Sequence, residues 1–303
     1  MRIGVMFGAT PEPDETLDGL VARAKDLEAR GFHSMWVANI FGLDAITSMA
    51  IAGRETDRIE LGTAVVPSYP RHPTAIAQQG LTAQAASGGR FVLGIGLSHK
   101  LVIEDMMGLS YAKPARHMRE YMEVLGPLLR CEPAKFAGDE YRVNVALDVP
   151  GASPVPVLIA ALGEQMLRIA GRTSSGSILW MTGPQTIESH IGPKLRAAAS
   201  EADRPEPRIV AGFPIVVTHD ADAAREAIGK GLAMYGMLPS YRAMLDKEGA
   251  AGPADIAIVG DEKAVGESLD RLRDVGVTDF DAAIFPADEG AGARTLEFLQ
   301  SRL

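Results

Sequence analysis

Residues 61–67 are Leu-Gly-Thr-Ala-Val-Val-Pro, and residues 87–96 are Ser-Gly-Gly-Arg-Phe-Val-Leu-Gly-Ile-Gly. Ile59 to Val66 and Phe91 to Ile95 are aliphatic and β-branched without polar alternation, which indicates strands covered on both faces, as in a parallel sheet. Residues 74–87 between them suit a helix, with Pro73 as a start signal and Gly88-Gly89 as a stop. The stretch therefore predicts a strand, helix, strand unit whose crossover allows parallel pairing.

The same alternation extends along most of the chain. Strand-like runs occupy residues 2–7, 34–37, 59–66, 91–95, 157–160, 177–180, 208–217 and 280–285, with helical patterns between most of them. About eight alternating units predict an α/β fold of the (β/α)8 TIM-barrel type. We expect one domain over residues 1–303, whose first helix runs from Asp14-Glu15 to a stop at Gly31.

Two segments interrupt this alternation of strands and helices, and one predicted helix carries a pair of polar residues. Residues 136–143 have the pattern of an inserted hairpin around Ala137-Gly138-Asp139-Glu140. Residues 234–253 carry Met and Tyr side chains on an extra helical segment, which suits either the lining of a substrate pocket or ordinary core packing. His117 and Glu120 share one helix face, and without a third ligand nearby they are expected to be solvated polar residues.

Composition narrows the class of protein. The 303 residues are 47% hydrophobic and 23% charged, with a net charge of -9 and no cluster of Lys and Arg, which argues against nucleic-acid binding. Cys131 is the single cysteine, so no intrachain disulfide or cysteine-based zinc site is expected. The apolar run at residues 1–7 is too short for a signal peptide, and no run approaches a membrane span. We expect a cytoplasmic protein.

Several motifs together resemble the bacterial luciferase-like superfamily. They are the Gly-Thr-x-Val run of residues 62–65, the His72-Pro73 helix start, the Ser87-Gly88-Gly89-Arg90 turn, the Leu93-Gly94-Ile95-Gly96 strand end and the run from Val157 to Gly163. The similarity extends over nearly the whole chain and is greatest to the branch that uses the deazaflavin coenzyme F420. It implies a luciferase-like barrel, a small organic substrate and a protein that is often a homodimer.

In such barrels the active site forms at the carboxyl ends of the strands, so residues just after each strand are the first candidates. These positions and the resemblance predict cofactor contacts from Phe7, Asn39, Ala64, Val65, Val66, Gly96, Ser98, His99, Ala161, Leu162, Gly163 and Thr182, and no metal. The resemblance also implies a non-prolyl cis peptide at Ala64-Val65, where the alternative is a regular buried strand.

Two of these residues are candidates for catalysis. His99 occupies the position at which some relatives have a glutamate proton donor, so it could donate a proton, hold an anionic group of the coenzyme or be merely structural. Asn39 could hydrogen-bond the deazaflavin ring or cap a local turn. At Ala161 to Gly163 a strand ends and a helix opens, so free backbone N–H groups there could bind the coenzyme phosphate; an ordinary tight turn is the alternative.

The function that this pattern favours is hydride transfer between coenzyme F420 and an organic substrate, with reduction of an activated C=C or C=O bond. Gly94-Ile95-Gly96 lacks the third glycine of a nicotinamide-dinucleotide site, which argues against that cofactor. Two alternatives stay open. One is an FMN-dependent monooxygenase of the same fold, and the other is a noncatalytic cofactor-binding protein on this scaffold.

Overall fold

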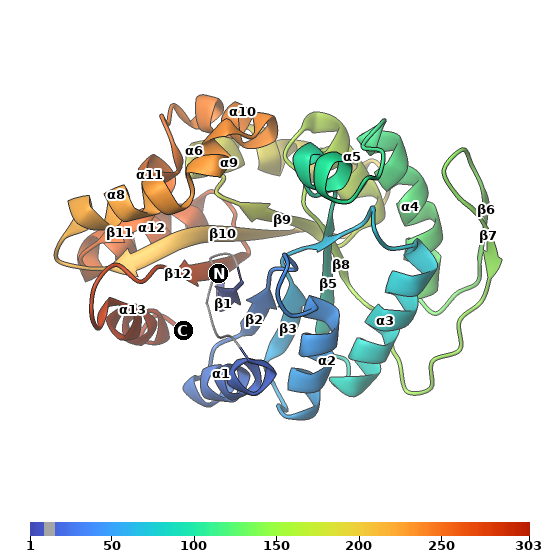
Figure 1. Ribbon diagram of the computed structural model, residues 1–303, viewed down its shortest axis with the longest axis horizontal. Helices are drawn as coiled ribbons and strands as arrows, with labels where there is room; N and C mark the ends of the chain where they lie inside the picture. The colour runs from blue at the N-terminus through green and yellow to red at the C-terminus, as the bar shows by residue number, and fades with distance from the viewer. Residues whose placement is uncertain (9–15) are drawn as a thin grey trace.

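The computed structural model describes residues 1–8 and 16–303. Its main sheet closes into a barrel, because β12 pairs with β1 and β10 pairs with β9, all in parallel (Figure 1). The barrel strands are β1 (Arg2–Phe7), β2 (Ser34–Val37), β3 (Glu60–Thr63), β5 (Phe91–Gly96), β8 (Val157–Ile159), β9 (Gly176–Trp180), β10 (Arg208–Val217) and β12 (Asp279–Ile284). The predicted (β/α)8 barrel is confirmed.

Helices surround the barrel (Figure 1). Outside the segment between β10 and β11, the longer ones are α1 (Leu17–Arg30), α2 (Ala45–Arg54), α3 (Pro73–Ala86), α4 (Pro114–Leu129), α5 (Glu164–Thr173), α7 (Gly192–Ser200), α12 (Glu262–Asp274) and α13 (Ala291–Gln300). Short segments are η1 (Leu101–Met106), α6 (Pro184–Thr186) and η2 (Ile187–Ile191). α1 ends at Gly31 as predicted, because φ is 89° there and glycine adopts this conformation without strain. Its predicted start at Asp14-Glu15 lies outside the described residues.

The strand predicted over residues 59–66 is divided in the middle. β3 ends at Thr63, and the short β4 (Val66–Pro67) follows after a cis peptide bond between Ala64 and Val65. β3 and β4 both pair with β5. The cis peptide implied by the resemblance is therefore present, and the regular buried strand is excluded.

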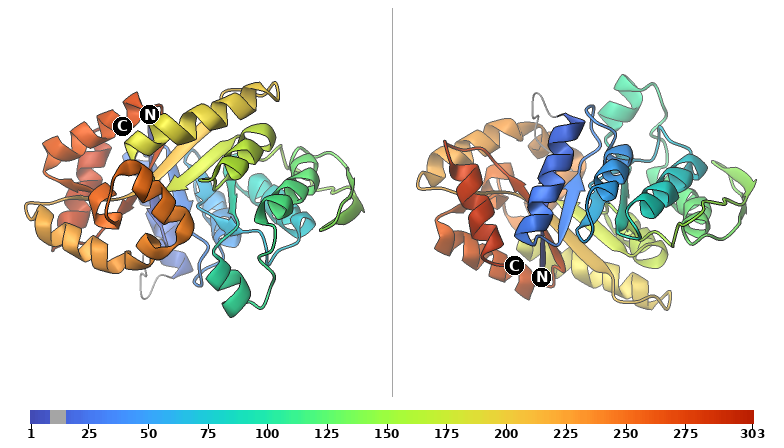
Figure 2. Two further views of the ribbon diagram at one scale, coloured as in Figure 1. Left: turned by 90° about the horizontal axis from the view of Figure 1, so that it is seen from above. Right: turned by 90° about the horizontal axis from the view of Figure 1, so that it is seen from below.

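The predicted hairpin consists of β6 (Ala134–Ala137) and β7 (Arg142–Val145), paired antiparallel. It stands beyond α4 at one edge of the molecule (Figure 2). Glu120 of α4 accepts hydrogen bonds from the backbone N–H groups of residues 139–141 at the hairpin turn. Our expectation that His117 and Glu120 are solvated was wrong: both are buried, because the hairpin packs over this part of α4.

The extra helical segment lies between β10 and β11 (Ile258–Gly260) and comprises α8 (Ala221–Gly231), α9 (Ala233–Met237), α10 (Pro239–Glu248) and α11 (Pro253–Ile256). β10 is long enough to pair first with β9, at residues 208–212, and then with β11, at residues 215–217. Glu248 at the end of α10 accepts hydrogen bonds from the N–H groups of Gln185 and Thr186. These bonds fix α10 to the segment that follows β9.

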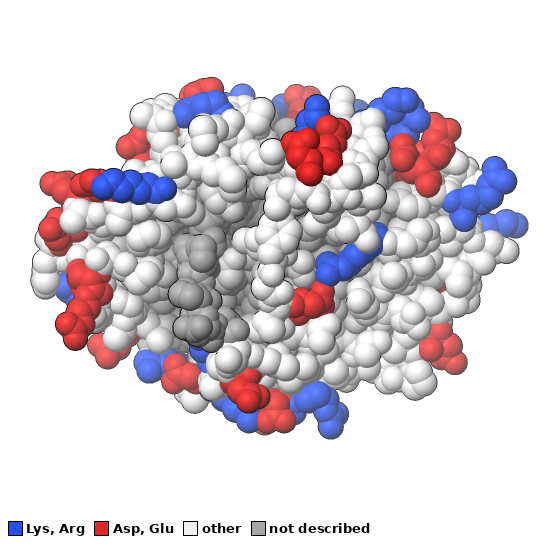
Figure 3. Space-filling view, viewed as in Figure 1, with Lys and Arg blue, Asp and Glu red and all other residues white. Residues whose placement is uncertain are grey.

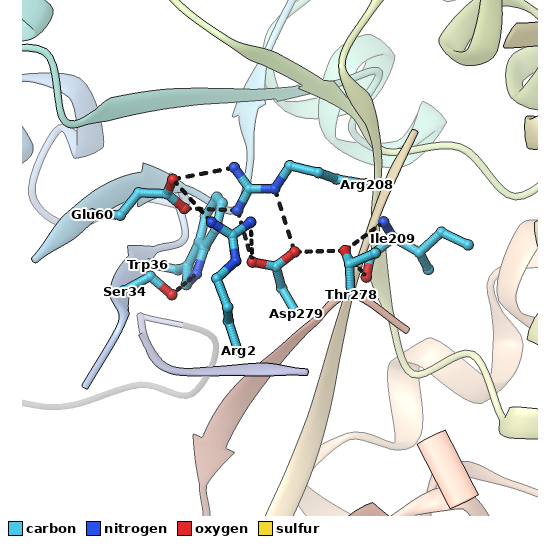
Figure 4. Close-up of polar contacts among 8 residues, drawn as sticks. All are labelled: Arg2, Ser34, Trp36, Glu60, Arg208, Ile209, Thr278 and Asp279. Carbon is cyan, nitrogen blue, oxygen red and sulfur yellow. Dashed lines mark hydrogen bonds and ion pairs between the residues drawn. The ribbon is translucent and has the colours of Figure 1, made fainter. Parts of the chain in front are cut away.

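An ionic network centred on the buried Asp279 lies at the amino-terminal end of the barrel (Figure 4). The Arg208 guanidinium lies between two carboxylates, 2.7 Å from Glu60 and 2.8 Å from Asp279, and Arg2 lies 2.6 Å from Asp279. Burial works to raise the pKa of Asp279, but Arg208, Thr278 and Arg2 outweigh it and hold that pKa below its ordinary value. The network closes the amino-terminal end of the barrel. The site is expected at the other end, where the strands have their carboxyl ends.

Among the described residues, no helix combines the length and the apolar character that a membrane crossing requires.

Candidate active site

A cavity of about 340 Å³ opens at the carboxyl ends of the barrel strands. The predicted residues that line it are Asn39, Ala64, Val65, Gly96, Ser98, His99, Ala161, Leu162 and Gly163. They come from the ends of four strands, β2, β3, β5 and β8, and the loops that follow. The structure therefore brings most of the predicted site together in one place.

Phe7, Val66 and Thr182 do not line this cavity. Successive side chains of a strand point to opposite faces, so Met6 and Val65 face the cavity while their neighbours Phe7 and Val66 pack outward against the helices. Thr182 is buried beside the end of β9. These three residues were predicted from their position near a strand end, without regard to the direction of their side chains.

The floor of the cavity is formed where Val65 packs on Gly96 at the end of β5. A Cβ on Gly96 would lie 2.7 Å from Val65 Cγ2, which is too short a distance for another side chain. A Cβ on Gly94 would instead first meet the carbonyl oxygen of Thr63. Gly96 is therefore the residue that leaves space for Val65 at the cavity.

Asn39 serves the local turn and also faces the cavity. Its Oδ1 accepts a hydrogen bond of 3.0 Å from the N–H of Ala45 at the start of α2. This contact supports the turn interpretation, and it leaves Nδ2 as the group that can face a ligand. Ser98 has a φ of 59°, and its carbonyl oxygen accepts a 3.2 Å hydrogen bond from the Tyr111 hydroxyl.

Four rings from three parts of the chain form one side of the cavity, which we call the aromatic wall: His99, Trp180, Tyr235 and Tyr241. The His99 ring centroid lies 6.2 Å from that of Tyr235 and 5.9 Å from that of Tyr241. Trp180 meets Tyr235 edge-on at 6.2 Å. The wall joins β5, β9 and the extra helical segment at one place.

The protonation states of the wall follow from burial. Burial lowers the pKa of His99, so the imidazole is neutral at pH 7, and burial raises the pKa values of Tyr235 and Tyr241. The Nε1 of Trp180 is buried and has no hydrogen-bond partner among the described residues. The wall therefore offers uncharged donors to a ligand and no fixed charge.

The turn from β8 into α5 presents backbone to the other side of the cavity. Gly163 is the N-cap of α5, and no atom lies within 4 Å of the position that a Cβ on it would take. His190 Nε2 lies 2.9 Å from the carbonyl oxygen of Leu162 and donates to it. In the part of the chain that the structure describes, no side chain caps the first N–H groups of α5, so a phosphate has room to approach them.

A second group of rings lies next to the cavity, behind Tyr111. Tyr69 packs against Tyr111, with ring centroids 5.2 Å apart, and stacks on His117 at 3.9 Å. His117 Nε2 lies 2.9 Å from the Ser68 hydroxyl, and burial lowers the pKa of this histidine to about 4. The group supports the loop that carries Tyr111.

Residue-by-residue prediction missed several lining residues: Phe41, Met107, Tyr111 and Trp180. Trp180 ends a predicted strand, so its position was a usable signal. The others belong to loops and short helices whose path the local sequence does not fix. For the extra helical segment we expected either the lining of a substrate pocket or core packing, and both occur. Met234 and Tyr235 line the cavity, while Met244 is buried in the core.

A parallel (β/α)8 barrel with an apolar cavity at its carboxyl face defines the class of this protein as a barrel enzyme. The model of the luciferase-like monooxygenase family matches residues 1–279, and the chain belongs to this family. The predicted superfamily is confirmed, and the chain is an oxidoreductase by class.

Relatives of known name agree with this placement. The 5,10-methylenetetrahydromethanopterin reductase of Archaeoglobus fulgidus is 30% identical over 231 residues, which are 75% of this chain and 68% of that one. The structure of the coenzyme F420-dependent tetrahydromethanopterin reductase of Methanopyrus kandleri has a TM-score of 0.80 at 23% identity, covering 100% and 98% of the two chains. An F420-dependent secondary alcohol dehydrogenase with an F420-acetone adduct has a TM-score of 0.79 at 18% identity, with the same coverage.

Proposed function

We propose that this protein transfers a hydride between coenzyme F420 and an organic substrate, reducing a carbonyl or an activated C=C bond. The names of the reductase and dehydrogenase relatives support the choice of coenzyme. The observation that carries the proposal is Trp180, which lines the cavity and whose buried Nε1 donor has no hydrogen-bond partner among the described residues. An unsatisfied buried donor is costly unless a ligand supplies the acceptor.

The residues around the cavity fit the chemistry of the coenzyme. Val65 on Gly96 would support the ring, while the Trp180 Nε1 and the Asn39 Nδ2 are neutral donors of the kind that ring carbonyl groups accept. The open backbone at Gly163 would take the phosphate. The ring, its carbonyl groups and the phosphate thus each have a counterpart of suitable polarity.

Reduced F420 supplies a hydride when bound, and reduction of a carbonyl also consumes one proton at the oxygen. His99 is the group on the aromatic wall that ionises nearest to neutral pH, and we assign it to supply this proton. Tyr235 and Tyr241 keep their protons at neutral pH and flank the imidazole on the side away from β5.

The test is a pair of titrations of the purified protein, with F420 and with FMN, followed by quenching of cofactor fluorescence. We expect binding of F420 with a dissociation constant in the low micromolar range, on the order of -8 kcal/mol, and at least tenfold weaker binding of FMN. A preference for FMN would support the monooxygenase alternative. Binding of neither refutes both, and F420 binding without turnover on ketones and enones would support a noncatalytic protein.

The two tryptophans of the chain provide a matched pair of variants. Trp180→Phe removes the unpartnered donor, so the dissociation constant of F420 should rise about tenfold, as the loss of one buried hydrogen bond implies. Trp36 donates to Ser34 Oγ inside the barrel and does not line the cavity. Trp36→Phe should therefore lower stability and leave the dissociation constant unchanged. Equal affinities for Trp180→Phe and the unaltered protein would contradict the assigned role.

A further inference from the structure

The mouth of the cavity carries apolar side chains that remain in water. Ile40, Phe41, Met107 and Met234 line the cavity, and they are 50%, 63%, 36% and 49% exposed. We call these four residues the apolar rim. They belong to three segments that are distant in sequence, after β2, after η1 and in α9. Grouped exposure of large apolar side chains around a cavity is typical of a surface that binds an apolar ligand.

The cavity behind the rim is uncharged. None of its lining residues in the described part of the chain is Asp, Glu, Lys or Arg. Figure 3 shows the same tendency on one face of the molecule, where charged side chains gather toward the outline and uncharged residues cover most of the middle. A charged substrate would lose its hydration here and find no counter-ion among the lining residues that the structure describes, which costs several kcal/mol.

Two polar groups of the cavity lie at the ends of barrel strands. The Trp180 Nε1 and the His99 ring lie in the aromatic wall, where β5 and β9 end, while the rim residues sit on the loops and the helix beyond. A substrate with its reacting oxygen at the wall would extend its remaining atoms toward the rim. These atoms gain free energy only if they are apolar.

We propose that the substrate is an uncharged ketone or aldehyde with an extended apolar body, whose carbonyl lies at the aromatic wall and whose body covers the apolar rim. This inference rests on the proposed function. In the reaction, a hydride adds to the carbonyl carbon, the π electrons of the C=O bond move to oxygen, and oxygen takes one proton. The products are an alcohol and the oxidised coenzyme.

The experiment uses 2-alkanones from 2-butanone to 2-decanone together with their ω-carboxylate analogues of equal length. With reduced F420, kcat/KM for the ketones should rise about threefold to fourfold per added methylene until the rim is covered. Each ω-carboxylate should be at least 100-fold poorer than the matching ketone. No dependence on chain length, or equal rates for the charged analogues, would overturn the inference.

Binding without turnover provides a second measurement. Ketone and oxidised F420 cannot react, so dissociation constants of the ketones can be measured on that complex by tryptophan fluorescence. They should fall with chain length in parallel with kcat/KM. The F420 titration without ketone separates the two hypotheses: absence of F420 binding refutes the proposed function and this inference with it, whereas F420 binding without chain-length dependence refutes the inference alone.

Two methionines of α9 provide the variant and its control. Met234 belongs to the rim, and Met237, 75% exposed, does not line the cavity. Met234→Lys should reduce kcat/KM for 2-decanone at least tenfold and raise it for the ω-carboxylate analogue, because the ammonium group offers a counter-ion. Met237→Lys should leave both values unchanged. The inference is wrong if both variants behave alike.

Discussion

Gly96 leaves the space that the side chain of Val65 occupies, since a Cβ on Gly96 would lie 2.7 Å from Val65 Cγ2. Gly96→Ala should therefore push Val65 into the cavity. We expect the dissociation constant of F420 to rise at least tenfold, with a loss of about 1–3 kcal/mol in the free energy of unfolding from the overpacked contact. Fluorescence titration and urea unfolding measure the two effects, and coenzyme affinity equal to that of the unaltered protein would contradict the role of the floor.

Gly163 provides the opposite case, because nothing lies within 4 Å of its Cβ position and its φ is -77°. Gly163→Ala should therefore keep the free energy of unfolding within about 0.5 kcal/mol. If a phosphate approaches this turn, the added methyl group should still weaken F420 binding severalfold. Unchanged affinity would remove the α5 turn from the phosphate site while leaving the floor untouched.

The pH dependence of reduction should follow His99. Burial lowers the pKa of its imidazole, so the protonated fraction that can supply a proton is small at pH 7 and grows as the pH falls. kcat for ketone reduction should thus rise between pH 8 and pH 6, and alcohol oxidation should show the opposite trend. His99→Ala should flatten the profile. His72, which caps α3 and does not line the cavity, is the control: His72→Ala should keep the slope.

The burial of Asp281 leads us to expect that the free energy of unfolding falls as the pH rises. This residue of β12 is fully buried, and neither carboxylate oxygen has a partner among the described residues. Burial, and then the charge of Asp279, raise its pKa well above the ordinary value. Above about pH 4 the unfolded chain releases this proton while the folded protein keeps it, so the free energy of unfolding decreases with rising pH, by up to about 1.4 kcal/mol per pH unit.

Asp281→Asn removes this ionisation at nearly the same volume. Urea unfolding at pH 4 should give similar free energies for the two proteins, and at pH 8 the Asn variant should be more stable. Parallel curves across this range would show that Asp281 does not titrate in the folded protein as its surroundings imply.

Arg208 should be a major contributor to stability, unlike the exposed ion pairs of the surface. Its side chain lies between Glu60 and Asp279, and the Asp279 side chain is only 2% exposed. Arg208→Ala leaves the buried Asp279 carboxylate without its main partner, which should lower the free energy of unfolding by about 3–5 kcal/mol. Arg208→Lys should lose less, because one ammonium keeps part of the attraction. A loss below about 1 kcal/mol for the Ala variant, as at surface pairs, would contradict this view.

Much of the barrel could be predicted from sequence because its strands are buried on both faces. Arg2–Phe7, Ser34–Val37 and Arg208–Val217 were predicted with the bounds that the structure gives them. Such strands appear as continuous aliphatic runs, and the Gly and Pro residues between them mark where each ends. These strand ends, together with the family resemblance, pointed to the edge of the barrel at which the cavity lies.

The rest depended on contacts between distant parts of the chain. His117 and Glu120 look like surface residues on α4, and only the packing of the hairpin makes them buried. Likewise Trp180 and Tyr235 become neighbours because the extra helical segment returns over the barrel. Side-chain direction also limited the prediction of the site. Phe7 ends a strand that was predicted correctly, yet its ring centroid lies 5.0 Å from the Arg23 guanidinium and the residue does not line the cavity.

The continuation of β10 past β9 has a consequence for how this protein can vary. Ile215 pairs with Ile258 and Val217 with Gly260, so the chain leaves the barrel wall after residue 217 and rejoins it on the adjacent strand. The segment between β10 and β11, residues 218–257, is therefore a cassette: its two ends lie side by side on paired strands. It carries two rings of the aromatic wall and Met234 of the rim. Exchange of that cassette between relatives would change the ligand that the barrel accepts and preserve its closure.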